Sequence, residues 1–229
     1  MTARKPRKAH IWERAADEWY VEPESVSIAL FGAERFWGPI WDPSCGGGNV
    51  VRAASLCGLS AVGTDLRDRG WDAEGLLFRG ARDFLATPHA DFLASNIVMN
   101  PPYGRGALTE AFIRHALGSP DVEKVAAFTE LRFITGDTRA ASLYADFPPS
   151  HVWILTPRPS CPPGVYLAAG NKAEGGTPDF CWIVWDRTLG PFPGACRLGW
   201  LHHADPDPSR KRKPAKGRDQ SGEVNEHRA

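Results

Sequence analysis

The sequence predicts an α/β fold built on a mostly parallel sheet, and three observations lead to this prediction. Apolar runs of strand length alternate with segments of helical spacing from about residue 24 onward. The stretch 39–48 passes from apolar residues into an acidic, glycine-rich turn, which is typical of a strand-to-helix connection that a ligand approaches closely. A length of 229 residues with 42% hydrophobic residues suits one domain with a sizeable core.

The expected elements follow one another along the chain. A helix is predicted over 24–31, because Pro23 precedes it and Gly32 follows it. Strand 39–42, helix 48–57 and strand 61–65 then predict a βαβ unit with parallel strands and a right-handed crossover. Further helices are expected over 108–117 and 138–144, and further strands near 81–85, 95–99, 124–129, 152–155 and 180–185. The Pro- and Gly-rich stretch 156–178 predicts a long functional loop.

The tetrapeptide Asn100-Pro101-Pro102-Tyr103 directly follows the apolar run 97–99. The Asn100 side chain can accept a hydrogen bond from an N–H group through its carbonyl oxygen. Pro101 keeps its carbonyl acceptor although it has no N–H, Pro102 makes the turn rigid, and Tyr103 offers a ring for stacking. If the Asn100 and Pro101 carbonyl oxygens both accept protons from one amine nitrogen, the lone pair of that nitrogen points outward. The tetrapeptide therefore indicates methyl transfer to the nitrogen of a base or of an amide.

These motifs, in this order, resemble class I S-adenosylmethionine-dependent methyltransferases, and more narrowly the small phage-type and bacterial DNA N6-adenine methyltransferases. The resemblance covers roughly residues 18–190. It implies a Rossmann-like fold with a seven-stranded, mostly parallel sheet, an antiparallel C-terminal hairpin and helices on both faces. It also implies transfer of a methyl group from S-adenosyl-L-methionine to the exocyclic N6 of adenine in DNA.

The resemblance carries roles onto matching residues. The catalytic tetrapeptide is Asn100, Pro101, Pro102 and Tyr103, with Asn100 also near the cofactor. The glycine-rich turn that binds the methionine part of the cofactor matches Asp42, Pro43, Cys45, Gly46 and Gly48. Asp65, which ends the next strand, matches the acid that chelates the ribose hydroxyls, and Asp83 matches an acid near the adenine. An N-terminal cofactor motif matches Tyr20 and Pro23, although Glu22 stands where that motif has threonine.

The implied mechanism flips the target adenine out of the duplex and transfers the methyl group directly, in line, from the sulfonium. Such a transfer needs no covalent enzyme intermediate, so none of the five cysteines is expected to be a nucleophile. Neither the cysteines nor the seven histidines show the spacing of a metal site. No metal is therefore expected.

The net charge of zero hides an asymmetry along the chain. Residues 1–8 carry four basic groups, and residues 209–229 carry seven basic and three acidic ones, so each end is +4 and the body is −8. We expect a flexible basic segment over 1–17, a methyltransferase domain over 18–200 and a disordered basic tail over 201–229. DNA is the expected partner, contacted by these ends or by loops 104–108, 130–138 and 157–179.

Other expectations concern context. The sequence has no run of about 18 apolar residues, so no membrane contact is expected. Five cysteines without a Cys-x-x-Cys pair indicate a reducing compartment, and hence the cytoplasm of a bacterium or of a phage-infected host. A monomer or weak dimer is expected. A phage origin and a role in restriction-modification come from the resemblance alone.

Four alternatives remain open at this stage. The tetrapeptide also occurs in enzymes that methylate N4 of cytosine in DNA, bases in RNA, or the side-chain amide of protein glutamine, because all of these present a planar nitrogen. A different class is a non-catalytic, methyltransferase-like module that binds nucleic acid. Glutamine methyltransferases usually carry a helical N-terminal domain, and the short segment before the first predicted strand favours nucleic acid over them.

Overall fold

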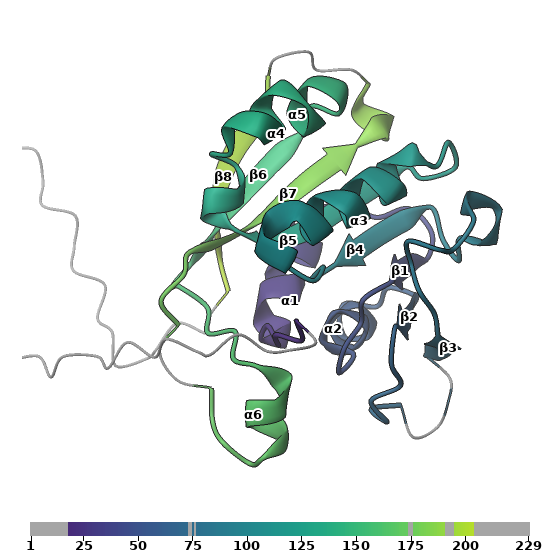
Figure 1. Cartoon of the computed structure of the whole chain (residues 1–229), viewed down its shortest axis with the longest axis vertical. Coiled ribbons are helices and arrows are strands. Elements are labelled where there is room, and N and C mark those ends of the chain that lie inside the picture. Colours follow the sequence, from purple (N-terminus) through teal and green to yellow (C-terminus); the bar gives the residue numbers. More distant parts are fainter. Residues whose placement is uncertain (1–17, 73–74, 76, 174–175, 191–194, 204–229) are drawn as a thin grey trace, which may run out of the picture.

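A computed structural model describes residues 18–72, 75, 77–173, 176–190 and 195–203. Its centre is an eight-stranded sheet in the order β3-β2-β1-β4-β5-β7-β6-β8, which runs in Figure 1 from β8 at the upper left to β3 at the lower right. The strands are β1 Ile40–Asp42, β2 Ala61–Asp65, β3 Phe78–Ala81, β4 Asn96–Met99, β5 Lys124–Glu130, β6 His151–Thr156, β7 Phe180–Asp186 and β8 Arg197–His202. The α/β class and the mostly parallel sheet predicted from the sequence are confirmed.

The strand directions place the carboxyl ends of β1, β2, β4 and β5 at one edge of the sheet, because β1 pairs in parallel with β2 and β4, and β4 with β5. Parallel α/β sheets bind their ligands at that edge. β7 runs antiparallel to both β5 and β6, so the predicted antiparallel C-terminal hairpin is confirmed.

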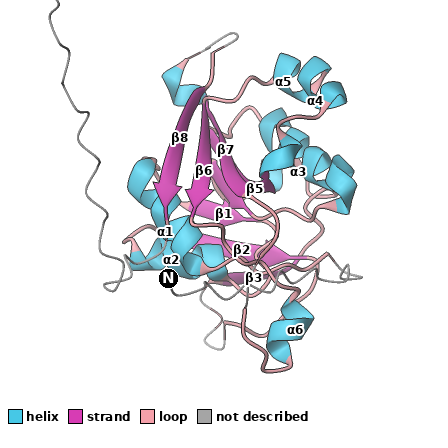
Figure 2. Ribbon diagram, turned by 90° about the vertical axis from the view of Figure 1, so that its left-hand side faces the viewer, coloured by secondary structure: helices cyan, strands magenta, loops and turns pink. Residues whose placement is uncertain are grey.

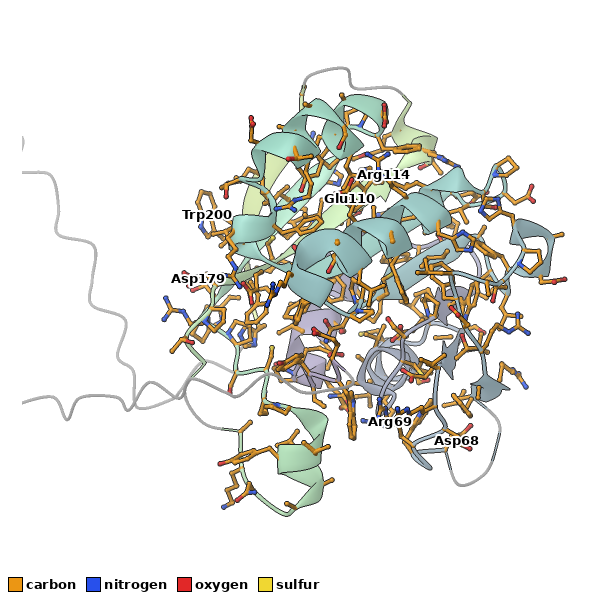
Figure 3. The ribbon with its side chains drawn as sticks, viewed as in Figure 1. Asp68, Arg69, Glu110, Arg114, Asp179 and Trp200 are labelled. Atoms are coloured by element: carbon orange, nitrogen blue, oxygen red, sulfur yellow. The ribbon has the colours of Figure 1, made fainter. Side chains whose placement is uncertain are left out.

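The number of strands differs from the prediction, because the structure has eight strands where seven were expected. β8 pairs in parallel with β6 at the outer edge of the sheet. Leu198 and Trp200 are 53% and 67% exposed, whereas Leu201 is buried, and Figure 3 shows Trp200 on the outside of the molecule. The inner strands are buried on both faces and appear in the sequence as continuous apolar runs. β8 is an edge strand and lacks such a run. Residues 201 and 202, assigned to the tail from sequence, thus belong to the sheet.

Helices lie on both faces of the sheet, as predicted. Figure 2 shows α1 and α2 on one side and α3, α4 and α5 on the other. The helices are α1 Glu24–Ala33, α2 Asn49–Leu56, α3 Ala107–Gly118, α4 Asp137–Ala141, α5 Leu143–Asp146 and α6 Gly164–Ala168. Each face has its own buried apolar cluster, one including Leu30 and Val50 and the other including Phe112 and Ile113.

Three predicted segments differ locally from the structure. The expected strand at 81–85 lies earlier, at 78–81, and residues 82–85 turn away from it. The helix predicted over 138–144 is two short helices, because the backbone of Ser142 is not helical. α6 interrupts the predicted long loop 156–178. In the described residues no helix has the length and apolar content needed to cross a membrane. The segments 1–17 and 204–229 lie outside the described residues.

Candidate functional site

A cavity of about 460 Å³ opens at the carboxyl ends of β1, β2 and β4. Such a volume is in the range of small-molecule sites. The first cavity, as we call it, is lined by the segment 18–22, by the turn after β1, by the loop 65–69 after β2, by residues 82–85 and by Asn100 and Pro102 after β4. Leu108 and Phe112 of α3 close its apolar side.

Seven of the ten predicted cofactor residues line this cavity: Tyr20, Pro43, Cys45, Gly46, Asp65, Asp83 and Asn100. The other three, Pro23, Asp42 and Gly48, are not among its lining residues. Pro23 is the N-cap of α1, and Asp42 is 1% exposed and accepts a hydrogen bond from the Ser44 N–H at 3.1 Å. These three residues therefore belong to the elements that carry the cavity and not to its lining.

Two glycines of the turn are required by its geometry. Gly48 has a φ of +81°, and a Cβ there would lie 2.4 Å from the Trp71 ring. Gly46 has a φ of +51°, and a Cβ there would lie 2.8 Å from Nε1 of Trp19. Both positions combine left-handed backbone with close packing, which only glycine accommodates without strain. The turn thus brings its backbone against the cavity wall.

The Asp65 carboxylate is held in place at the end of β2. Its Oδ2 accepts the Gly46 N–H at 2.9 Å, and its Oδ1 accepts the Arg67 N–H at 3.1 Å. Asp65 is 8% exposed and lines the first cavity. A carboxylate oxygen has more than one acceptor site, so each oxygen can still accept a hydroxyl proton. This arrangement suits the two hydroxyls of a ribose.

Asn100 lies at the end of β4 with both of its amide N–H groups engaged. Its Nδ2 donates to the backbone oxygen of Tyr20 at 3.0 Å and to Oε2 of Glu22 at 2.6 Å. Its Oδ1 accepts the Tyr103 hydroxyl at 3.3 Å. An amide turned over would place its oxygen against the Tyr20 carbonyl and the Glu22 carboxylate, so ionised Glu22 favours the orientation described. The carbonyl oxygen is therefore the polar group that Asn100 offers to a ligand.

Burial dominates the electrostatics beneath the first cavity. It raises the pKa of Glu22 from 4.5 to about 7, although hydrogen bonds and Arg52 oppose the shift. Burial, followed by the nearby Glu22 carboxylate, raises the pKa of Asp42 well above its ordinary value. Burial likewise raises the pKa of the Cys45 and Cys161 thiols, which keeps them protonated and poorly nucleophilic. Buried acids at a cavity favour a cationic ligand.

A second cavity, of about 320 Å³, adjoins the first. Glu18 and Tyr20 line both cavities, and Tyr103 of the tetrapeptide lines the second. The Tyr20 and Tyr103 rings lie 5.6 Å apart at 43°. All three loops predicted to contact DNA supply lining residues, namely Arg105, Glu130, Arg132, Cys161, Gly176, Thr177 and Pro178. Phe180, which starts β7, completes the aromatic part of the lining.

The tetrapeptide lies at the junction of the two cavities. Asn100 and Pro102 line the first and Tyr103 lines the second, while Pro101 is buried and is not among the lining residues of either. The Pro102 carbonyl accepts the Thr109 hydroxyl at 3.0 Å, which ties the turn to α3. A ligand in each cavity would therefore approach the other at Asn100.

The segment 18–22 lines the first cavity, supplies Glu18 and Tyr20 to the second, and is hydrogen-bonded to the loop before α6 and to the start of that helix. The Val21 N–H donates to the Pro162 carbonyl at 3.0 Å, and the Gly164 N–H donates to the Trp19 carbonyl at 2.8 Å. The guanidinium carbon of Arg69 lies 3.9 Å from the centre of the Trp19 ring, and Figure 3 shows Arg69 beside the lower end of α2. Sequence reasoning identified Tyr20 and Pro23 in this region but assigned no role to Glu18, Glu22 or Arg69.

Glu22 had one signal in the sequence, namely that it replaces a threonine of the resembled motif. Its burial and its hydrogen bond to Asn100, 78 residues away, come from the fold. Among the described residues, no group of three or more His, Cys, Asp or Glu side chains could hold a metal ion.

Comparison with solved structures gives the fold. The chain is similar to a "putative RNA methyltransferase" from Pyrococcus horikoshii, at a TM-score of 0.55 and 13% identity, over 78% of this chain and 94% of that one. It is also similar to TrmN from Thermus thermophilus (TM-score 0.46, 20% identity, 71% of this chain and 48% of that one). A TehB-like SAM-dependent methyltransferase from Corynebacterium glutamicum gives a TM-score of 0.46 and 12% identity, over 72% and 87%.

No family model matches the sequence, and no curated protein matches it. The first of the three similarities agrees with the Rossmann-like α/β fold predicted from the sequence, with β8 as an additional strand. At this level of identity the comparison concerns the fold alone.

Proposed function

We propose that this chain is an S-adenosylmethionine-dependent methyltransferase that acts on the exocyclic N6 of adenine in DNA. One observation carries the proposal: the Asn100 amide N–H groups are both engaged, so its carbonyl oxygen, which accepts the Tyr103 hydroxyl and can accept a second proton, is the group that can meet a ligand. Asn100 lines the first cavity, and Tyr103, its hydrogen-bond partner, lines the second. A methyl donor in the first cavity and an amine in the second would meet at this oxygen. The fold and the glycine-rich turn agree with this reading.

The residues of the first cavity fit the cofactor. The cofactor supplies a methyl group on a positively charged sulfonium, and the Glu22 carboxyl that lines this cavity favours a cation nearby when it is ionised. Asp65 would hold the ribose hydroxyls, Asp83 would lie near the adenine, and the turn from Pro43 to Gly46 would hold the methionine part. These roles follow the resemblance and agree with the positions of the side chains.

The second cavity fits a flipped base. Tyr103 and Phe180 line it and offer aromatic faces. The Asn100 carbonyl oxygen would accept one proton of the amine, and the Pro101 carbonyl, whose residue lines neither cavity, would accept the other as the resemblance implies. The two hydrogen bonds would pull the amine protons out of the plane of the base, which moves the nitrogen toward a tetrahedral, nucleophilic form. As the nitrogen–carbon bond forms, the carbon–sulfur bond breaks, and the nitrogen then loses one proton to water. Positioning and electrostatics supply most of the rate enhancement.

The rim of the second cavity favours a nucleic acid as the substrate. Arg105 and Arg132 lie on it, and guanidinium groups are well suited to phosphate. Arg105 is exposed and Arg132 is 83% exposed, with its guanidinium paired to Glu130. A phosphate backbone across this rim would place a base over the cavity. This feature favours DNA or RNA over a protein glutamine.

The test uses tritium-labelled S-adenosylmethionine and unmethylated DNA, followed by digestion to nucleosides and their separation. The proposal predicts label in N6-methyldeoxyadenosine, and no label when the DNA is already methylated at adenine. Label in N4-methylcytosine would keep the methyltransferase and correct the base. Label only in RNA or protein substrates would contradict DNA as the substrate. Failure to bind the cofactor at all would favour a non-catalytic module.

A further inference from the structure

We infer that Glu22 is a positioning residue for the methyl transfer: its carboxylate holds the Asn100 amide so that the carbonyl oxygen faces the acceptor amine. The inference rests on the proposed function and extends it to a residue that the tetrapeptide does not contain. Glu22 precedes α1 and Asn100 follows β4, and the two side chains meet at 2.6 Å between Oε2 and Nδ2. Glu22 is 5% exposed.

The contact does two things to Asn100. It occupies the second N–H of the amide, whose first N–H is occupied by the Tyr20 carbonyl at 3.0 Å, and so it fixes the orientation of the group. It also polarises the amide, because a carboxylate that accepts from an amide N–H increases the negative charge on the amide oxygen. A more negative Oδ1 is a stronger acceptor for the amine protons. The ionised form of Glu22 is therefore the productive one.

The surroundings of Glu22 set the pH range in which this contact changes. Burial disfavours its charge, and the pKa stands at about 7. The groups that face it from the packed elements are Arg52 of α2, Glu24 of α1, Asp42 of β1, and the neutral side chains of Tyr103 and Cys161. With a pKa near 7, turnover should rise about tenfold between pH 6 and pH 8.5 as Glu22 ionises.

The first test needs no turnover. In side-chain amide NMR, the Asn100 Nδ2 signals are identified by their loss in Asn100→Asp and followed from pH 5 to pH 9. We expect an inflection near pH 7 in the native chain, no inflection in Glu22→Gln, and an inflection moved to lower pH in Glu24→Gln, because Glu24 raises the pKa of Glu22. An inflection that persists in Glu22→Gln would overturn the inference.

The second test uses turnover. Glu22→Gln keeps a side-chain carbonyl that accepts from Asn100 but cannot ionise, so its turnover should stay near the native value at pH 6 and lose the rise around pH 7. Glu22→Ala removes the acceptor as well, and kcat should fall roughly tenfold to hundredfold below that of the glutamine variant. Equal kcat in the alanine and glutamine variants would overturn the inference. If the NMR inflection follows Glu22 while no substrate is methylated, the contact stands and the proposed function fails, so the two failures are distinguishable.

Discussion

At the scale of single residues, two carboxyl groups are buried near the first cavity, and their burial lowers the stability of the folded protein. Glu22 and Asp42 are 5% and 1% exposed, and burial raises the pKa of both. Ionising a buried carboxyl is unfavourable unless a cation or a strong hydrogen bond compensates. A cationic ligand would supply this compensation when it binds. The site is therefore arranged for binding at the expense of the stability of the free protein.

The cost at Glu22 predicts a pH-dependent effect on stability. The pKa of Glu22 is raised from 4.5 to about 7 on folding, so between these values the folded state holds a proton that the unfolded chain has lost. The Glu22 contribution to stability therefore falls as pH rises through this range. Glu22→Gln should raise the free energy of unfolding by about 1–3 kcal/mol at pH 8 and change it little at pH 5. Urea unfolding at the two pH values measures the difference. An equal gain at both values would contradict this account.

At the scale of elements, the segment 18–22 depends on its contact with the start of α6. A Cβ at Gly164 would lie 2.1 Å from the Trp19 ring, which has no room to move aside without shifting the segment. Gly164→Ala should therefore weaken cofactor binding at least tenfold while the protein remains folded. Isothermal titration calorimetry gives the affinity, and circular dichroism reports the fold.

Gly32→Ala provides the matched control for this change. Gly32 lies in α1, and a Cβ there would meet nothing within 4 Å. The control should leave cofactor affinity unchanged and stabilise the helix by about 0.5–1 kcal/mol. Unchanged affinity in Gly164→Ala would show that Trp19 and the segment 18–22 do not depend on this packing.

A buried ionic network joins several elements at the edge of the sheet opposite the site. The Lys124 ammonium of β5 lies 3.1 Å from Oε2 of Glu34 and 2.7 Å from Oδ2 of Asp186, and it donates to the Arg35 carbonyl at 2.7 Å. Burial opposes the ionisation of Asp186, but hydrogen bonds from Lys124 and Thr188 outweigh it and hold the pKa of Asp186 below its ordinary value. This network fixes β5 against α1 and β7.

Removing the cation should leave two buried carboxylates without the lysine charge, with the hydrogen bonds from Trp153 to Glu34 and from Thr188 to Asp186 still in place. Lys124→Met is expected to lower the free energy of unfolding by about 3–5 kcal/mol at pH 7. The control is Arg114→Ala, which breaks the partly exposed pairs with Glu110 and Asp146 on the surface of α3 (Figure 3) and should cost under about 1 kcal/mol. Urea unfolding compares the two. A similar small loss in both variants would contradict a structural role for Lys124.

The sequence pattern predicts some strands and helices more accurately than others, and the reasons are physical. The inner strands β1, β2, β4, β5 and β7 were placed to within a residue or two, because burial on both faces gives continuous apolar runs. β8 lies at an edge and exposes Leu198 and Trp200, so its pattern is weak. α6 is five residues long and follows prolines, which gives too few positions for a helical period.

At the scale of the whole molecule, the fold joins motifs that are distant in the sequence. The parallel strands bring the glycine-rich turn, Asp65 and Asn100 to one edge, and the sequence order of these motifs was enough to predict that meeting. The contact between Glu22 and Asn100 spans 78 residues and no local pattern encodes it. The division of the site into two adjoining cavities likewise depends on how several loops from distant parts of the sequence pack together.

At the scale of the site, Asn100 lines the first cavity and its carbonyl oxygen accepts the hydroxyl of Tyr103, which lines the second. If Asn100 accepts the protons of the reacting amine, its loss should affect turnover far more than cofactor binding. The direct measurement is the pair of kcat and cofactor Kd for Asn100→Ala, with tritium transfer to DNA for the first and calorimetry for the second. We predict a fall in kcat of about 100-fold or more with Kd within about threefold of the native value. An equal loss in both quantities would contradict the assigned role and, with it, the central claim.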